Sequence, residues 1–100
     1  MKLQNGHIII PAEIVKEVLE DEVQINWVFY PERNSFLMAG KSKTFFEKLH
    51  KTAWQTLKDK SLKGDKSLFV RAILMDYDLD ETDRDLDFEV KNTGIISINL

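Results

Sequence analysis

Asp76-Tyr-Asp-Leu-Asp-Glu-Thr-Asp-Arg-Asp-Leu-Asp-Phe-Glu89 alternates polar and apolar residues, and it carries eight acids against one base. Strict alternation is typical of a β-strand, because successive side chains leave a strand on opposite faces. If Leu79 pairs with Leu86 in an antiparallel hairpin, Tyr77 faces Phe88 on an apolar side. The pattern therefore predicts two antiparallel strands joined by a short loop.

The same register gathers six carboxylates on the other side of this predicted hairpin. They form three directly opposed pairs: Asp80 with Asp85, Asp78 with Asp87, and Asp76 with Glu89. Like charges directly across a ladder destabilise it. We therefore expect an acidic interaction face that meets open water, a cation or a basic partner.

The hairpin extends into a predicted C-terminal meander. Leu68 to Leu79 reads as a long strand, and Asp85 to Lys91 as the next one. The turn Asn92-Thr-Gly94 has glycine where positive φ is often required. It pairs each apolar residue of one strand with an apolar residue of the other: Val90 with Ile96, Phe88 with Ile98, and Leu86 with Leu100. The C-terminal part, residues 68–100, is predicted to be a three-stranded meander.

The first half of the chain predicts a strand, a helix and a hairpin. His7 to Ile10 reads as a buried strand, and Pro11 suits the first turn of a helix over Ala12 to Glu20. Val23 to Tyr30 and Ser35 to Ala39 read as two strands around a proline turn. The expected register is Tyr30 opposite Ser35, Phe29 opposite Phe36, and Trp27 opposite Met38.

A second helix is predicted from Ser42 to about Asp59 or Ser61, with an apolar stripe of Phe46, Leu49, Ala53 and Leu57. The predicted order is β-α-β-β-α-β-β-β. We expect an α+β fold whose largely antiparallel sheet is covered by helices on one side. Residues 1–100 are predicted to form a single domain, and no internal repeat is evident.

Charge is unevenly distributed along the chain. Residues 41–71 carry nine Lys or Arg and three acids, whereas residues 76–89 are strongly acidic. Such blocks are solvated faces or interaction surfaces, directed at another molecule or at each other. The absence of cysteine, of a signal peptide and of a long apolar run leads us to expect a cytoplasmic protein without a membrane partner.

The sequence offers no convincing catalytic or metal centre. Asp76, Asp78 and Asp80 have the spacing of the first three ligands of a calcium-binding EF-hand loop. Glu81 and Asp87, however, occupy the positions where that loop needs glycine and glutamate. Weak divalent binding by the carboxylate row stays open beside a plain solvated face. No phosphate loop, nucleophile elbow or convincing Ser/His/Asp set is present. We expect a non-enzymatic protein with no cofactor and no small-molecule substrate.

Gly6-His-Ile-Ile-Ile-Pro-Ala-Glu-Ile-Val-Lys-Glu-Val-Leu19 resembles the AbrB/MraZ swapped-hairpin transcriptional regulators, and the resemblance covers residues 3–50. It implies a DNA-binding homo-oligomer in which Lys2, His7, Lys41 and Lys43 contact phosphates of duplex DNA. The family's arginine falls on His7, however. MraZ-like proteins also carry a second copy of the motif, and the only candidate, residues 79–88, lacks the Gly and Ile-Pro elements.

Two functions follow from these observations. The first is a small binding protein, a diverged DNA-binding regulator of the AbrB/MraZ type. The alternative is a protein–protein interaction module whose acidic hairpin docks on a basic surface, such as the Lys48, Lys51 and Lys58 face of a neighbouring subunit.

Overall fold

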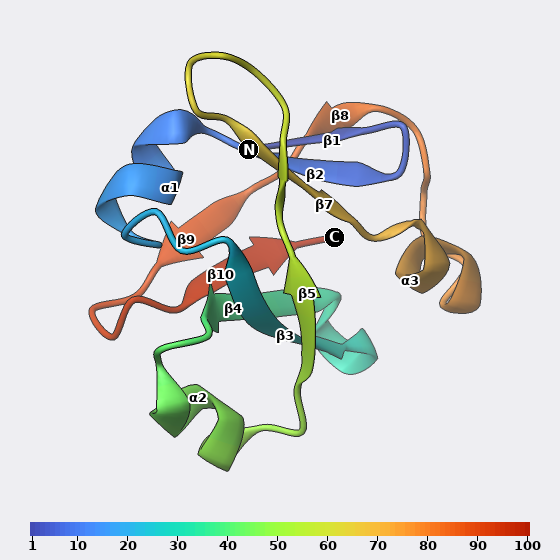
Figure 1. Ribbon diagram of the computed structural model, residues 1–100. Coiled ribbons are helices and arrows are strands. Elements are labelled where there is room, and N and C mark those ends of the chain that lie inside the picture. The colour runs from blue at the N-terminus through green and yellow to red at the C-terminus, as the bar shows by residue number, and fades with distance from the viewer.

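The computed structural model describes residues 1–100 and has an α+β fold with antiparallel sheets (Figure 1). In chain order its elements are β1 (Lys2–Gln4), β2 (His7–Ile10), α1 (Ala12–Glu17), β3 (Gln24–Tyr30), the 3₁₀ helix η1 (Pro31–Arg33), β4 (Ser35–Gly40), α2 (Thr44–Leu49), β5 (Ala53–Thr56), β6 (Lys58–Asp59), β7 (Lys66–Phe69), α3 (Arg71–Asp76), β8 (Arg84–Asp85), β9 (Phe88–Val90) and β10 (Ile96–Asn99). None of the helices is long and apolar enough to cross a membrane.

The strands form two five-stranded sheets that join at both edges. The first has the order β6-β7-β2-β1-β8, and the second has the order β5-β3-β4-β10-β9. The segment β5–β6 passes from one sheet to the other through Leu57, and β8–β9 does the same through Leu86. The sheets therefore close into a barrel, which leaves few free strand edges.

The barrel encloses a core of 17 buried residues from both sheets and from helices α1 and α3. Leu57 and Leu86, at the two bends, are both part of this core. Helix α2 lies outside the barrel, where Phe46 packs with Ala39 and Ile95 in a smaller cluster. The predicted arrangement, a sheet covered by helices on one side, is therefore wrong, because the two sheets mainly cover each other.

The predicted hairpin between β3 and β4 is confirmed in every pair. Tyr30 lies opposite Ser35, Phe29 opposite Phe36, and Trp27 opposite Met38. Asn34 closes the turn with a left-handed backbone at φ 48°, a conformation that asparagine tolerates better than most residues.

The predicted meander is half right. Val90 pairs with Ile96 and Phe88 with Ile98, as expected. Leu86 does not pair with Leu100, because the chain bends at Leu86 into the first sheet. The other neighbour of β10 is β4, so the C-terminal strands complete the second sheet instead of forming a meander of their own.

The predicted strand from Leu68 to Leu79 is wrong. Strand β7 ends at Phe69, and α3 follows it. Val70, Ile73 and Leu74 are buried at helical spacing, and that spacing competes with the alternation farther along the chain. Because α3 occupies this segment, Leu79 does not pair with Leu86 and the acidic hairpin does not form.

The second helix is much shorter than predicted. Helix α2 ends at Leu49, and the chain continues as β5, which pairs with the edge of β3. Of the expected stripe, only Phe46 and Leu57 are buried, and Leu57 is buried at the bend of a strand. The pairing of β5 with β3 satisfies backbone groups that a longer helix would leave exposed on the edge of β3.

Strand β1 was not predicted, although the sequence contains its signal. Asn5 and Gly6 form a two-residue turn with φ values of 50° and 75°, and this dipeptide is the strongest short hairpin signal. Leu3 and Ile8 pair across the hairpin and are both buried.

The barrel has an internal pseudo-two-fold arrangement that the sequence did not reveal. The first half, β1-β2-α1-β3-β4, has the same order as β5/β6-β7-α3-β8/β9-β10. Equivalent strands meet each other as the antiparallel pairs β2–β7 and β4–β10. The segments after α1 and α3 are also alike. The backbone N–H of Leu19 donates to the carbonyl of Ile14, and that of Leu79 donates to the carbonyl of Leu74.

Candidate functional site

The six acids predicted to form one face lie on different parts of the molecule. Asp76 ends α3, and Asp78 follows with a left-handed backbone at φ 53°. Asp85 lies in β8 opposite Lys2. The structure thus separates the predicted opposed pairs, and the like-charge row that motivated a cation or a docking partner is absent.

Asp80 organises the loop that replaces the predicted hairpin turn. Its Oδ1 accepts bonds from the backbone N–H of Thr82 at 2.9 Å and from the Thr82 hydroxyl at 2.7 Å. These bonds, and then the charge of Arg84, lower the pKa of Asp80, while partial desolvation opposes them. Arg84 also donates to the carbonyls of Asp80 and Leu100, so the loop is tied to the C-terminal residue.

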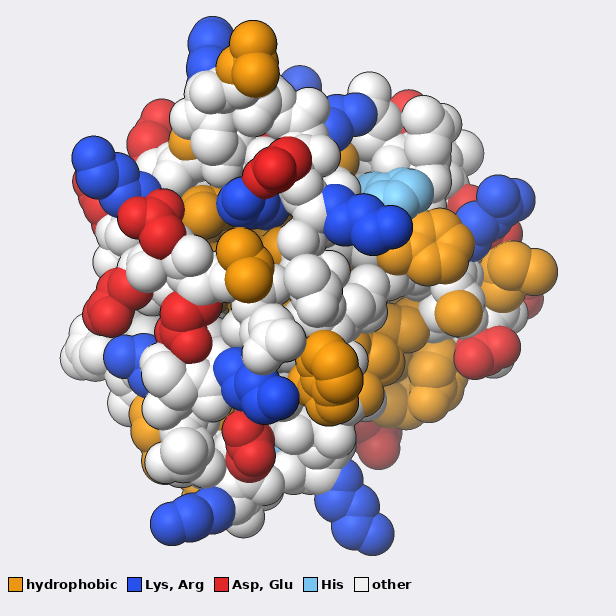
Figure 2. Space-filling model, viewed as in Figure 1, with side chains coloured by type: hydrophobic (Ala, Val, Ile, Leu, Met, Phe, Trp, Pro, Cys, Tyr) orange, Lys and Arg blue, Asp and Glu red, His pale blue; other side chains and the backbone are white.

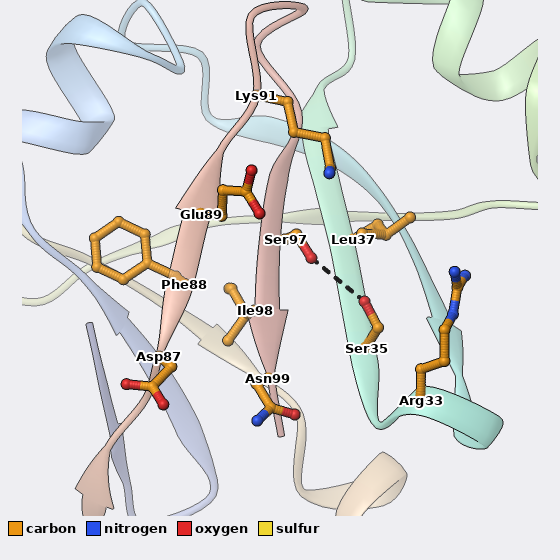
Figure 3. Close-up of a pocket in the computed structure, with 10 residues that line it drawn as sticks. All are labelled: Arg33, Ser35, Leu37, Asp87, Phe88, Glu89, Lys91, Ser97, Ile98 and Asn99. Atoms are coloured by element: carbon orange, nitrogen blue, oxygen red, sulfur yellow. Dashed lines mark hydrogen bonds between the residues drawn. The ribbon is translucent and has the colours of Figure 1, made fainter.

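Asp87 and Glu89 line a shallow groove on the outer side of the second sheet (Figure 3). Arg33 and Lys91 lie on the same groove. The lining residues come from β4, β9, β10 and their flanks: Arg33, Ser35, Leu37, Asp87, Phe88, Glu89, Lys91, Ser97, Ile98 and Asn99. Because both signs of charge line this open groove, it lacks a concentrated acidic field.

Lys2 and His7 lie on the outer side of the first sheet, which no helix covers in Figure 1. A cross-strand row runs through Asp85, Lys2, Ile9, Ser67 and Lys58, each residue directly opposite the next. In the next row, the ring of His7 lies 4.9 Å from that of Phe69. This side of the barrel therefore presents two lysines and a histidine, with one acid at its edge.

Lys41 and Lys43 lie elsewhere, just beyond the end of β4 in the second sheet. The Lys41 ammonium lies 4.7 Å from the centre of the Trp54 ring, and Lys43 lies 4.0 Å from Glu20. The four residues proposed for phosphate contact are thus split between two sheets, and two of them have an acidic neighbour, Asp85 opposite Lys2 and Glu20 beside Lys43.

Polar contacts fasten α2 to the outside of the barrel. The buried Asn26 side chain, only 3% exposed, donates to Glu47 at 2.6 Å. The Tyr30 hydroxyl bonds to Nδ1 of His50, whose ring also packs on Phe46 at 5.0 Å. His50 therefore has a structural position between helix and sheet.

A hollow of about 360 Å³, here called the barrel mouth, lies between β3, α3 and the segment that leads into β5, and six of its nine lining residues are apolar. Trp27 lines the hollow, and its ring stacks on that of the buried Phe36 with centroids 5.4 Å apart. Tyr77 closes one side by packing on Phe29 at 5.0 Å. The residues that line the barrel mouth are Trp27, Val28, Phe29, Lys51, Thr52, Ala53, Ile73, Asp76 and Tyr77.

Large apolar side chains are also exposed on the strands and helix nearest the barrel mouth. Trp54 on β5 is 59% exposed, Met75 on α3 is 62% exposed, and Tyr77 is 48% exposed. Figure 2 shows a broad hydrophobic area on this side of the molecule, with lysines beside it. Contiguous exposed apolar surface on a small protein is typical of an interaction site.

The barrel mouth is a place where the two pseudo-symmetric halves differ. Leu19 and Leu79 donate equivalent backbone hydrogen bonds, so we treat them as equivalent positions of the two halves. Glu13 of α1 then corresponds to Ile73, and Glu17 corresponds to Tyr77. The first half thus has carboxylates where the second half has an apolar wall. The alternating pattern of the sequence places Tyr77 in a strand and so does not indicate this site, although the spacing of residues 70, 73, 74 and 77 is helical.

Comparison with known proteins adds no assignment: no family model, no curated protein and no solved structure matches the chain. The resemblance of residues 3–50 to the AbrB/MraZ regulators stays a prediction. The candidate second copy of its motif, residues 79–88, lies in the second structural half but not at β7 and α3, which are the equivalents of β2 and α1.

Proposed function

We propose that this chain is a non-enzymatic binding protein, and that its barrel mouth receives an apolar side chain of a partner protein. The observation that carries the proposal is the open hollow between β3, β5 and α3, lined by Trp27, Phe29, Ala53, Ile73 and Tyr77. Tryptophan and tyrosine dominate binding energy at protein interfaces when an apolar anchor fills the space between them.

Burial energetics support an apolar anchor. Moving a leucine- or phenylalanine-sized side chain from water into an apolar site contributes about 1.5–3 kcal/mol. The wall is already assembled, because Trp27 stacks on Phe36 and Tyr77 packs on Phe29. A preformed wall lowers the ordering cost that a partner would otherwise meet on binding.

The charged residues at the edge of the barrel mouth would orient a bound partner. Lys51 and Asp76 line the same hollow, and no salt bridge occupies either of them. Rim charges contribute more to orientation and association rate than to affinity. We therefore expect partners that combine an apolar anchor with flanking charge.

A mouth-filling variant tests this proposal. Random 12-residue peptides displayed on phage would be selected on the wild-type protein, and the enriched peptides measured by calorimetry. Ala53→Trp places a large side chain in the hollow, and Thr56→Trp is the matched control, since Thr56 is exposed on the same strand outside the mouth. Ala53→Trp should abolish binding of peptides that share an apolar anchor, and Thr56→Trp should not. Equal binding to both variants would refute a role for the barrel mouth.

Duplex DNA is a second candidate, favoured by the outer side of the first sheet. Lys2 and Lys58 lie in one cross-strand row there, and His7 lies in the next. Lysine contacts to phosphates supply most non-specific affinity. The pseudo-two-fold order of the chain also fits the double motif that the MraZ resemblance implies.

A salt series on fluorescent duplex DNA tests this candidate. Affinity should fall steeply with salt, and Lys2→Ala and Lys58→Ala should each reduce the salt slope by about one. Lys48→Ala, on the separate helix α2, is the control that should leave the slope unchanged. Absence of binding at low salt would end the DNA interpretation without affecting the barrel mouth.

A further inference from the structure

Leu62 is a fully exposed leucine at the tip of the turn between β6 and β7. A single exposed leucine is ordinary on a protein surface. This one is unusual because of how rigidly its turn is held and because of the charges on either side of it.

Hydrogen bonds fix the turn that carries Leu62. The Ser61 hydroxyl donates to Asp65 at 2.9 Å, and the Lys63 backbone N–H donates back to the Ser61 oxygen at 3.3 Å. Asp65 also accepts a 2.7 Å bond from the Ala12 backbone N–H at the start of α1. The leucine is therefore presented to solvent by an ordered turn, which reduces the entropy lost when it is buried.

The bases beside Leu62 complement the acids on the α3 side of the barrel mouth, where Lys51, which precedes β5, is the one base among the lining residues. Lys60 and Lys63 flank the leucine, and neither takes part in a salt bridge. Asp76 lines the mouth and Asp78 is exposed two residues later, both likewise outside any salt bridge. The basic segment that carries Leu62 can therefore pair with the acidic residues beside the barrel mouth while the leucine acts as the apolar anchor.

The turn and the barrel mouth lie too far apart for one chain to join them. Figure 1 shows the β6–β7 turn at the top and α3 at the right, beyond the opposite end of β7. A Cβ added at Gly64 of the turn would lie 3.5 Å from Cβ of Ala12, which belongs to α1 and not to α3. A contact between the two surfaces therefore requires two molecules.

We propose that Leu62 of one copy occupies the barrel mouth of a second copy, so that the chains assemble head to tail. This inference rests on the proposed binding role of the mouth and names its partner. Because the two contacting surfaces differ, the contact is heterologous, and it continues into rings or open chains rather than stopping at a dimer. Its salt dependence follows from the pairing of Lys60 and Lys63 with Asp76 and Asp78.

Sedimentation analysis at increasing concentration tests the assembly. The wild-type mass should rise with concentration, as mass action requires of a weak self-association. Leu62→Asp should remain monomeric throughout. Val90→Asp is the matched control, because Val90 is also an exposed apolar residue but lies on β9, at the opposite edge of the second sheet from β5, and lines neither surface. Loss of assembly in both variants would contradict the specific role of Leu62.

Mixing two assembly-deficient variants provides the decisive measurement. Leu62→Asp retains an open mouth, and Ala53→Trp retains the leucine, so the mixture should form a 1:1 dimer and nothing larger. Variants that stay monomeric after mixing would overturn the proposal, provided that circular dichroism shows both are folded. A monomeric wild-type protein that still binds selected peptides at the mouth would reject Leu62 as the partner and leave the proposed function standing.

Discussion

The ring of Tyr77 lies against the ring of Phe29, with centroids 5.0 Å apart and planes inclined by 55°. In the alternating pattern of the sequence, Tyr77 faces Phe88 instead. This contact joins the end of α3 to β3 and makes one wall of the barrel mouth, so the stability of the fold and the shape of the site depend on the same pair.

Tyr77→Ala should lower the free energy of unfolding by about 1 kcal/mol, because a tilted aromatic pair contributes about 0.5–1.5 kcal/mol beyond its area. Urea denaturation followed by fluorescence measures the change. Tyr77→Phe keeps the ring and should have near wild-type stability. Equal losses in both variants would show that the hydroxyl matters and the ring contact does not.

Gly6→Ala should be strongly destabilising, by about 1–3 kcal/mol. Gly6 has φ 75°, and an added Cβ would lie 2.8 Å from Cβ of Arg71. Gly94→Ala is the control, since Gly94 has φ 85° but its Cβ would meet only the flexible end of Lys43 at 3.4 Å. Thermal unfolding should therefore show a larger loss for Gly6→Ala, and equal losses would mean that the approach of α3 is not tight.

Glu47→Ala should cost about 1–3 kcal/mol, because it leaves the buried amide of Asn26 without its acceptor. Glu47→Gln preserves an acceptor oxygen and should lose much less. Chemical denaturation of both variants gives the comparison. If the two variants were equally stable, water would be replacing the carboxylate and α2 would not depend on this bond.

Asp80 should contribute a pH-dependent part of the stability. Its pKa in the folded chain is lowered from 3.8, mainly by the bonds from Thr82. A lowered folded pKa gives stability that is present above pH 3.8 and is lost as the pH falls through the folded value. The stability difference between the wild type and Asp80→Asn should therefore shrink on acidification. Asp76→Asn is the control, and the same pH profile for both variants would argue against the Thr82 contact as the cause.

Short-range patterns in the sequence were reliable where the paired residues are close in the chain. The hairpin of β3 and β4 has the register that its alternation and proline turn predict. The turn at Asn92-Thr-Gly94 sets Val90 opposite Ile96. The sequence also contains the signal for β1, because Asn5-Gly6 is a typical two-residue hairpin turn.

The candidate site could be predicted from the sequence only in part. Trp27 and Phe29 were placed correctly in a strand, but the residues opposite them come from β5 and α3. Both segments were assigned the wrong structure, since the apolar spacing of residues 46–57 fits a helix and that of residues 75–90 fits strands. Without those two elements the barrel mouth has only one wall.

The sequence by itself determined the α+β class, the antiparallel hairpins and the registers that depend on neighbouring turns. Only the tertiary structure decided that residues 53–56 form a strand, that residues 71–76 form a helix, and that the acids of residues 76–89 are dispersed. The physical reason is that segments of four to six residues are not stable alone. Residues 53–56 are stabilised as a strand because they pair with the edge of β3. Residues 71–76 are stabilised as a helix because that conformation buries Ile73 and Leu74 in the core.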